Sequence, residues 1–175
     1  MELKIKRLSD KAIMPIRAHE GDAGLDLTTT SITSEINECG QFILVYHSDI
    51  AVEIPDGYVG LLFPRSSIAK KSIQFTNAVG VIDSGYRGEI MAKVRNTSGD
   101  SVPAVYKVGE KFAQLVIVPY VSDITITETT ELQDSDRGAG GYGSSDVKED
   151  VSAVNDTDKP VQEPAVEGNT SEAVA

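Results

Sequence analysis

The segment from residue 80 to residue 89, Gly-Val-Ile-Asp-Ser-Gly-Tyr-Arg-Gly-Glu, combines residue types that can do chemistry. Asp83 follows an apolar run, and Tyr86 comes three positions later. On a regular strand this odd spacing would place the two side chains on opposite faces. A turn at Ser84 and Gly85 would instead bring both into one pocket. A carboxylate beside an aromatic ring suits a general base next to a flat ligand; the alternative is a hairpin turn with a solvated aspartate.

Two further segments are suited to anions. Residues 64–70 end an expected strand and open a short expected helix, which Ser66 or Ser67 would cap. Arg65 and the two hydroxyls at a helix N-terminus favour a phosphate, although a capped helix with a surface salt bridge is the alternative.

The second of these segments, residues 137–145, carries four glycines within six residues, so its amides could approach an anion closely. Arg137 could contact a terminal phosphate, and Tyr142 could stack on a base. The segment lacks the Gly-Lys-Ser/Thr ending of a P-loop. A flexible linker is the alternative.

Two polar side chains interrupt apolar strands. Asp26 lies between two leucines, where a buried carboxylate needs a paired charge or a nearby metal. Gln114 lies within the apolar run 112–117, where its amide needs hydrogen-bond partners from the protein or a ligand. Each residue alone is also consistent with a purely structural role.

The order of apolar runs and turn signals predicts an all-β sandwich or barrel. The only helix expected lies at residues 66–72. The expected strands are 3–8, 25–29, 42–47, 51–54, 59–63, 72–75, 90–95, 111–119 and 124–129.

Composition excludes several classes of protein. The net charge of −11 argues against a general nucleic-acid or anionic-membrane binder, and no apolar run approaches the length of a membrane span. Cys39 is the single cysteine, which excludes an intrachain disulfide and a cysteine zinc cluster. His19 and His47 lack metal-ligand spacing and are interpreted as structural or surface residues. The charged, alternating N-terminus resembles a strand rather than a signal peptide, so we expect a soluble cytoplasmic protein.

The last thirty residues, 146–175, differ from the rest. They contain no Leu, Ile, Met or aromatic residue, and their eight acids and two lysines give a net charge of −6. Such a segment cannot bury enough apolar area to fold. We expect a disordered acidic tail, which could bind a protein partner or serve solubility.

Together, and in this order, the five segments closely resemble the five motifs of the trimeric dUTP pyrophosphatase (dUTPase) family across residues 23–145. The resemblance implies an all-β, distorted jelly-roll fold with one short helix, assembled as a homotrimer with active sites between subunits. It implies a core at 1–130, a glycine-rich arm at 131–145 that closes the active site, and the tail at 146–175.

The resemblance also implies the reaction. The enzyme would hydrolyse dUTP to dUMP and pyrophosphate, which limits uracil in DNA and supplies dUMP for dTMP synthesis. Asp83 would activate the water that attacks the α-phosphorus. Mg²⁺ would be held by the phosphates and waters, with Asp26 contacting it through water. The implied substrate-binding residues are Arg65, Ser66, Ser67, Asn77, Gly80, Val81, Ile82, Tyr86, Gln114, Arg137, Gly141, Tyr142, Gly143, Ser144 and Ser145.

Two positions, Ser67 and Tyr142, depart from the family pattern, and a third, Lys93, bears on a related family. Ser67 stands where glycine is usual, and the related dCTP deaminases also carry Arg-Ser-Ser. The position matching the deaminase glutamate is Lys93, which argues against deamination. Tyr142 replaces the usual phenylalanine, and either ring can stack.

Overall fold

The computed structural model describes residues 1–98 and 104–140 of the chain. The chain divides into two units, Met1–Ile126 and Thr127–Ala175. The strands, the sheets and the core described below all belong to the first unit.

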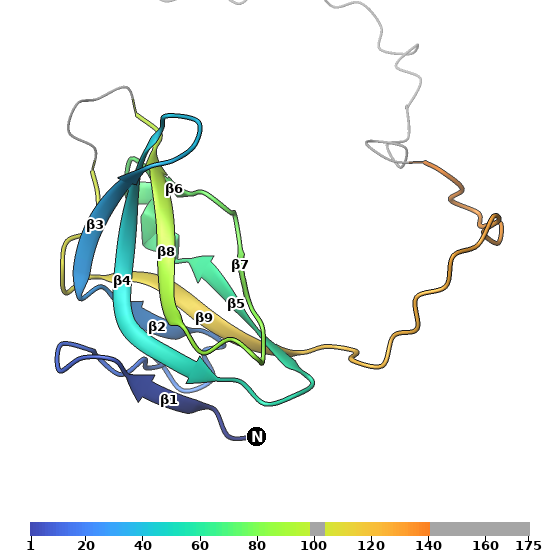
Figure 1. Ribbon diagram of the computed structural model, residues 1–175, viewed down its shortest axis with the longest axis horizontal. Helices are drawn as coiled ribbons and strands as arrows, with labels where there is room; N and C mark the ends of the chain where they lie inside the picture. The colour runs from blue at the N-terminus through green and yellow to red at the C-terminus, as the bar shows by residue number, and fades with distance from the viewer. Residues whose placement is uncertain (99–103, 141–175) are drawn as a thin grey trace, which may run out of the picture. The chain divides into compact units, whose positions relative to one another are not determined.

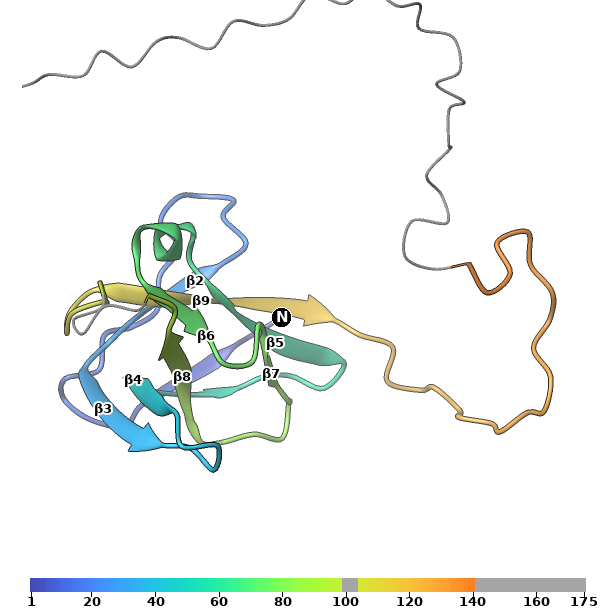
Figure 2. The same cartoon turned by 90° about the horizontal axis from the view of Figure 1, so that it is seen from above.

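Two antiparallel sheets form this first unit (Figures 1 and 2). One sheet has the order β1 (Lys4–Arg7), β4 (Phe42–Glu53), β8 (Glu89–Asn96) and β6 (Ile73–Phe75), with β3 (Ser31–Ile36) also pairing with β4. The other has the order β2 (Leu25–Thr28), β9 (Lys111–Pro119), β5 (Tyr58–Pro64) and β7 (Gly80–Ile82). The all-β fold is therefore confirmed, and within residues 1–98 and 104–140 it has one short helix.

The structure corrects the expected elements in four places. Strand β7 was not among the expected strands, because its three residues form only a short run before Asp83. Strand β3 was not predicted, because four of its six residues are exposed and its pattern is weak. The strands expected at 42–47 and 51–54 are one continuous strand, β4, which carries an irregularity between His47 and Ala51. Residues 124–129 form no strand; their β-branched residues favour extended backbone, but no ladder partner is present among the described residues.

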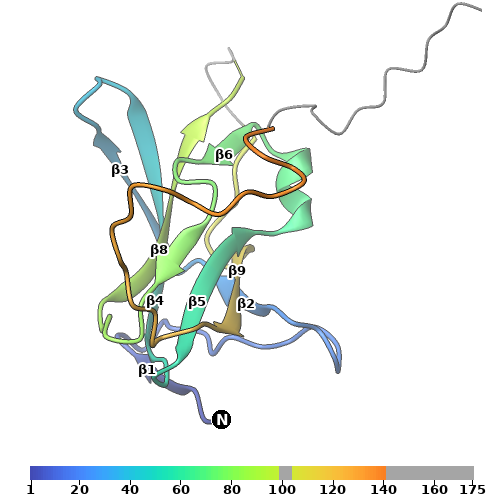
Figure 3. The same ribbon diagram turned by 90° about the vertical axis from the view of Figure 1, so that its right-hand side faces the viewer.

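The expected helix is a five-residue 3-10 helix, η1 (Ser66–Lys70), which follows β5 (Figure 3). Neither serine caps it. Arg65 occupies the N-cap position with extended backbone, and no side chain there bonds the helix N–H groups. The Ser67 hydroxyl pairs instead with the Tyr106 hydroxyl at 2.9 Å.

Aromatic side chains join the two sheets in the core. Tyr46 of β4 stacks on Phe112 of β9 with 5.5 Å between ring centroids, and Tyr106 packs edge-on against Tyr46 at 5.9 Å. The Tyr46 hydroxyl accepts a hydrogen bond from the Tyr106 backbone N–H at 3.1 Å. All three rings are buried.

The turn between β3 and β4 is organised by one side chain. Asn37 Oδ1 accepts hydrogen bonds from the backbone N–H groups of Cys39, at 3.1 Å, and Gln41, at 2.8 Å. Gly40 completes the turn with a φ of 75°, a conformation that glycine adopts without strain. The Cys39 side chain is exposed at this turn.

Candidate active site

The segment around Asp83 forms a hairpin pocket. Strand β7 pairs with β5, and the backbone N–H of Tyr86 donates to the Asp83 carbonyl at 3.0 Å, which closes a turn. The turn brings the Asp83 and Tyr86 side chains to one cavity of about 280 Å³, as the sequence predicted. The hairpin pocket is lined by Asn77, Gly80, Val81, Ile82, Asp83, Tyr86, Glu89, Met91 and Lys93.

Glycine positions the tyrosine ring in this pocket. A Cβ atom at Gly88 would lie 2.5 Å from Tyr86 Cζ, so the ring packs directly against the glycine backbone. The Tyr86 hydroxyl donates to the Glu89 carbonyl at 3.0 Å. Although its side chain is 42% exposed, Tyr86 is thus held at both its ring and its hydroxyl.

Asp83 itself is exposed. Among the residues that the structure describes, its carboxylate has neither a hydrogen-bond donor nor a cationic partner. A carboxylate in this condition can accept a proton from a water molecule placed beside it.

A second cavity, which we call the Arg65 pocket, has a volume of about 280 Å³. Its main charged group is Asp26, which is 7% exposed. Arg65 Nε donates to Asp26 Oδ1 at 2.8 Å, and Lys111 Nζ donates to Asp26 Oδ2 at 2.8 Å. These two cations offset the cost of burying the carboxylate. The pocket is lined by Ala18, Asp22, Ala23, Gly24, Asp26, Arg65, Ser66 and Gln114.

Strand register sets the place of Gln114 in the Arg65 pocket. Asp26 of β2 pairs with Gln114 of β9, so the two polar side chains predicted from separate strands lie on neighbouring ones. Gln114 Nε2 donates to the Pro64 carbonyl at 3.1 Å. Gly24 makes room for the amide, because a Cβ there would lie 2.7 Å from Gln114 Oε1.

The two serines of η1 face different cavities. Ser66 lines the Arg65 pocket, whereas Ser67 lines a larger cavity of about 580 Å³. Arg65 borders both. The larger cavity is lined by Ile13, Thr28, Arg65, Ser67, Lys70, Lys71, Tyr106, Gly109, Glu110 and Lys111.

The remaining predicted residues belong to the second unit. Arg137 is exposed, and its Nε donates to the Gly140 carbonyl at 3.2 Å. The other predicted residues of the arm lie outside the described residues: Gly141, Tyr142, Gly143, Ser144 and Ser145. The tail at 146–175 lies outside them too.

Reasoning from sequence did not single out Met91, and it considered Lys93 only as the position that matches the deaminase glutamate; both residues line the hairpin pocket. The alternation of residues along β8 could have identified both, because Ile90, Ala92 and Val94 are buried at every second position. The intervening residues must then share the opposite face.

The described residues contain neither a cluster of metal ligands nor a membrane-spanning helix. No three His, Cys, Asp or Glu side chains gather there in a way that could hold a metal ion. Within the same part of the chain, no helix has the length and apolar character needed to cross a membrane.

The all-β unit combines an acidic and aromatic pocket with a larger cavity that four cationic side chains line. Such a combination suits a protein that binds a small anionic ligand. The dUTPase family model matches residues 10–146. The chain is 41% identical over 151 residues to the deoxyuridine 5'-triphosphate nucleotidohydrolase of Clostridium acetobutylicum, covering 85% of this chain and 99% of that protein. It is also 41% identical over 161 residues to the nucleotidohydrolase of the same name from Rhodococcus erythropolis, with 91% and 93% covered.

Solved structures agree with these relatives. A mutant dUTPase of Staphylococcus bacteriophage 80alpha with dUpNHpp matches with a TM-score of 0.68 and 32% identity, covering 82% of this chain and 98% of that one. A mutant dUTPase from phage phi11 of S. aureus, described with a structural Mg(II) ion, matches with a TM-score of 0.62 and 30% identity, with 77% and 100% covered. The chain belongs to the dUTPase family.

Proposed function

We propose that this protein is a dUTP diphosphatase that uses Asp83 as its general base. The observation that carries the proposal is a turn that brings an anchored tyrosine ring and the Asp83 carboxylate into one pocket. No described residue pairs with that carboxylate. Membership of the dUTPase family supplies the substrate. The products are dUMP and pyrophosphate, so the reaction limits uracil in DNA and supplies dUMP for dTMP synthesis.

The chemical step is a hydrolysis at the α-phosphorus. Asp83 accepts a proton as the oxygen of a water molecule attacks phosphorus, and the bond from the α-phosphorus to the bridging oxygen breaks. Pyrophosphate leaves with that oxygen. A positioned base of this kind contributes about 10²–10⁴ to the rate.

Substrate recognition is divided between base, sugar and phosphates. The hairpin backbone at Gly80, Val81 and Ile82, together with Asn77, reads the uracil edge, while Tyr86 packs under the deoxyribose and excludes a 2′-hydroxyl. Cytosine presents a donor where uracil presents an acceptor, and leaving a fixed contact unpaired in this way can reject a substrate by about 10⁴–10⁵.

The phosphates are bound by residues around Arg65 and by the arm. Arg65, Ser66, Ser67 and Gln114 hold the triphosphate. From the arm, Arg137, Ser144 and Ser145 hold its γ end, Tyr142 stacks on uracil, and Gly141 and Gly143 allow close approach.

The donor set in the Arg65 pocket fits Mg²⁺ bound through water. Both Asp26 oxygens already accept hydrogen bonds from cations, so the carboxylate suits a water-mediated contact better than direct coordination. Mg²⁺ keeps several waters and is commonly bound by phosphates with few carboxylates. When bound, it supplies charge stabilisation along the triphosphate.

The proposed assembly is a homotrimer with a site shared between subunits. In one chain the hairpin pocket and the Arg65 pocket have no lining residue in common. A site that needs the base from one pocket and the phosphate ligands from the other is completed when copies of the chain meet. A solution mass three times that of the 18.7 kDa chain would support this.

Pyrophosphate release from dUTP, dTTP, dCTP and UTP, measured with Mg²⁺ and with a chelator, tests the reaction. We expect rapid, metal-dependent release from dUTP. Asp83→Asn should lower the rate by about 10²–10⁴, while the matched control Asp56→Asn, at an exposed turn residue, should leave it unchanged. Turnover retained in Asp83→Asn would remove Asp83 from the mechanism, and ammonia release from dCTP would point to a deaminase instead.

A further inference from the structure

Strand β4 contains a bulge next to the hairpin pocket. His47 pairs with Met91 and Ala51 pairs with Glu89, so the three β4 residues 48–50 stand opposite the single β8 residue Ile90. The Ser48 hydroxyl donates to the Ile90 carbonyl at 2.6 Å, and Asp49 adopts a φ of 53°. Left-handed backbone is uncommon for a residue other than glycine, so surrounding contacts must maintain it.

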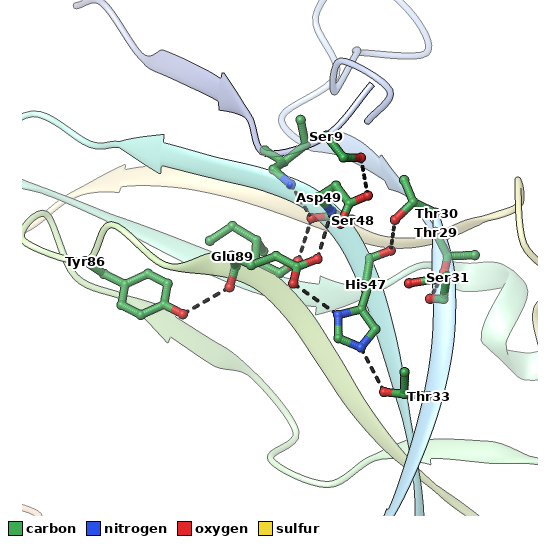
Figure 4. Close-up of polar contacts among 12 residues, drawn as sticks. Ser9, Thr29, Thr30, Ser31, Thr33, His47, Ser48, Asp49, Tyr86 and Glu89 are labelled. Carbon is green, nitrogen blue, oxygen red and sulfur yellow. Dashed lines mark hydrogen bonds and ion pairs between the residues drawn. The ribbon is translucent and has the colours of Figure 1, made fainter. Parts of the chain in front are cut away.

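The Glu89 carboxylate contacts two β4 residues at this bulge (Figure 4). Its Oε1 accepts from the backbone N–H of Asp49 at 2.8 Å, and its Oε2 pairs with His47 Nδ1 at 3.0 Å. The Glu89 and His47 side chains are only 18% and 21% exposed. On the other side of the imidazole, Nε2 pairs with the Thr33 hydroxyl at 2.8 Å.

Because an ionised carboxylate can only accept hydrogen bonds, Nδ1 of His47 carries the proton in this pair. The imidazole therefore bridges β3 to β8, with Thr33 at one nitrogen and Glu89 at the other. Both carboxylate oxygens of Glu89 are engaged by β4. The position of Glu89 is thus fixed by groups outside the hairpin.

The backbone of the same residue holds the sugar-facing tyrosine. The Glu89 carbonyl accepts the hydrogen bond from the Tyr86 hydroxyl, as Figure 4 shows. Glu89 is consequently a junction: its side chain is tied to β4, and its main chain is tied to Tyr86. A displacement of the Glu89 carboxylate would therefore also shift the Glu89 carbonyl, to which the Tyr86 hydroxyl donates.

We propose that His47 is a positioning residue for sugar selectivity, acting through Glu89 to hold Tyr86 where it excludes a 2′-hydroxyl. This rests on the proposed function of Tyr86. His47 is not among the residues that line the hairpin pocket, so we expect the cleavage step by Asp83 not to depend on it. Loss of the Nδ1 contact should therefore affect discrimination between dUTP and UTP more than turnover of dUTP.

Two variants with amide side chains each retain one of the two hydrogen bonds of the His47 imidazole, either the bond to Glu89 or the bond to Thr33. In His47→Asn the amide nitrogen is attached at Cγ, near the place of Nδ1, and can still donate to Glu89. In His47→Gln the amide is attached one carbon further out, near the place of Nε2, and can reach Thr33 but not Glu89. A merely structural histidine would make the two variants behave alike.

The measurement is kcat/KM for dUTP and for UTP in wild type and both variants, with urea unfolding of each. We expect His47→Gln to lower the dUTP/UTP selectivity about 10-fold, with kcat for dUTP retained. His47→Asn should keep the selectivity within about twofold. Unchanged selectivity in His47→Gln, or equal losses in both variants that follow their stability, would overturn the proposal.

A second readout does not require activity. With tyrosine labelled at ¹³Cζ, the Tyr86 resonance, assigned by Tyr86→Phe, should shift in His47→Gln and keep its place in His47→Asn. An unmoved resonance in His47→Gln would reject the connection between His47 and Tyr86. Wild-type protein that does not hydrolyse dUTP would instead reject the proposed function, so the two failures are distinguishable.

Discussion

Asp26 offers a direct test of how this fold holds a buried charge. The residue is 7% exposed, and its carboxylate accepts two short hydrogen bonds from Arg65 and Lys111. A charge-assisted bond contributes about 1.5–3 kcal/mol, and the lower value applies because each cationic partner is about one-third exposed. Losing both bonds would cost about 3 kcal/mol, and an amide oxygen recovers about 1 kcal/mol. Asp26→Asn should therefore lower the free energy of unfolding by about 2 kcal/mol.

A double-mutant cycle separates the ion pair from other effects. Lys111→Met alone should cost about 1.5 kcal/mol, because Arg65 still pairs with the carboxylate. In the Asp26→Asn background the same change should cost much less, which gives a coupling energy of about 1 kcal/mol. Urea unfolding followed by circular dichroism, without Mg²⁺ or nucleotide and at one protein concentration, measures all four proteins. Additive effects of the two substitutions would refute the assignment of Lys111 as a partner of Asp26.

Three other changes have expected outcomes. Gly88→Ala should displace the Tyr86 ring, since the new Cβ would lie 2.5 Å from Tyr86 Cζ. The ratio of kcat/KM for dUTP to kcat/KM for UTP should then fall. An unchanged ratio would argue against the Tyr86 ring as the group that excludes a 2′-hydroxyl. Tyr46→Phe should lower the free energy of unfolding by about 1–3 kcal/mol in urea titrations, because a buried backbone N–H loses its acceptor. A hydrogen bond from the Lys107 backbone N–H lowers the pKa of Glu110 below its ordinary 4.5. The ionised Glu110 carboxylate therefore stabilises the folded protein above pH 4.5, and this stabilisation is lost as the pH falls through the folded-state pKa. The stability difference between wild type and Glu110→Gln should accordingly shrink from about pH 7 to about pH 3, and a constant difference would contradict the assignment.

The sequence predicted those elements whose pattern is local. Strands β5 and β9 are long apolar runs bounded by turn signals, and both lie close to the expected ranges. Strand β3 escaped prediction because its residues are largely exposed, so burial does not impose a regular alternation. Strand β4 was divided in two because the polar pair Ser48 and Asp49 resembles a turn, whereas the Glu89 carboxylate allows that pair to remain within a strand as a bulge.

In the site, too, contacts between residues close in sequence could be predicted, whereas contacts between residues far apart in sequence could not. The pocket shared by Asp83 and Tyr86 followed from a four-residue turn, which nearby sequence encodes. The partners of Asp26 could not be found in this way, because Lys111 is 85 residues away and reaches the carboxylate only through the pairing of β2 with β9. Similarly, nothing near His47 in sequence indicates its contact with Glu89, which is 42 residues distant.

The exposed thiol of Cys39, at the turn between β3 and β4, allows the protein to be spin-labelled for electron paramagnetic resonance. Because Cys39 is the only cysteine in the chain, a nitroxide reagent attaches one spin to each copy without any substitution. In an assembly with threefold symmetry, three spins occupy the corners of an equilateral triangle, whereas a twofold assembly holds a single pair. Pulsed dipolar measurements distinguish two coupled spins from three, so the symmetry of the oligomer can be determined from the label alone.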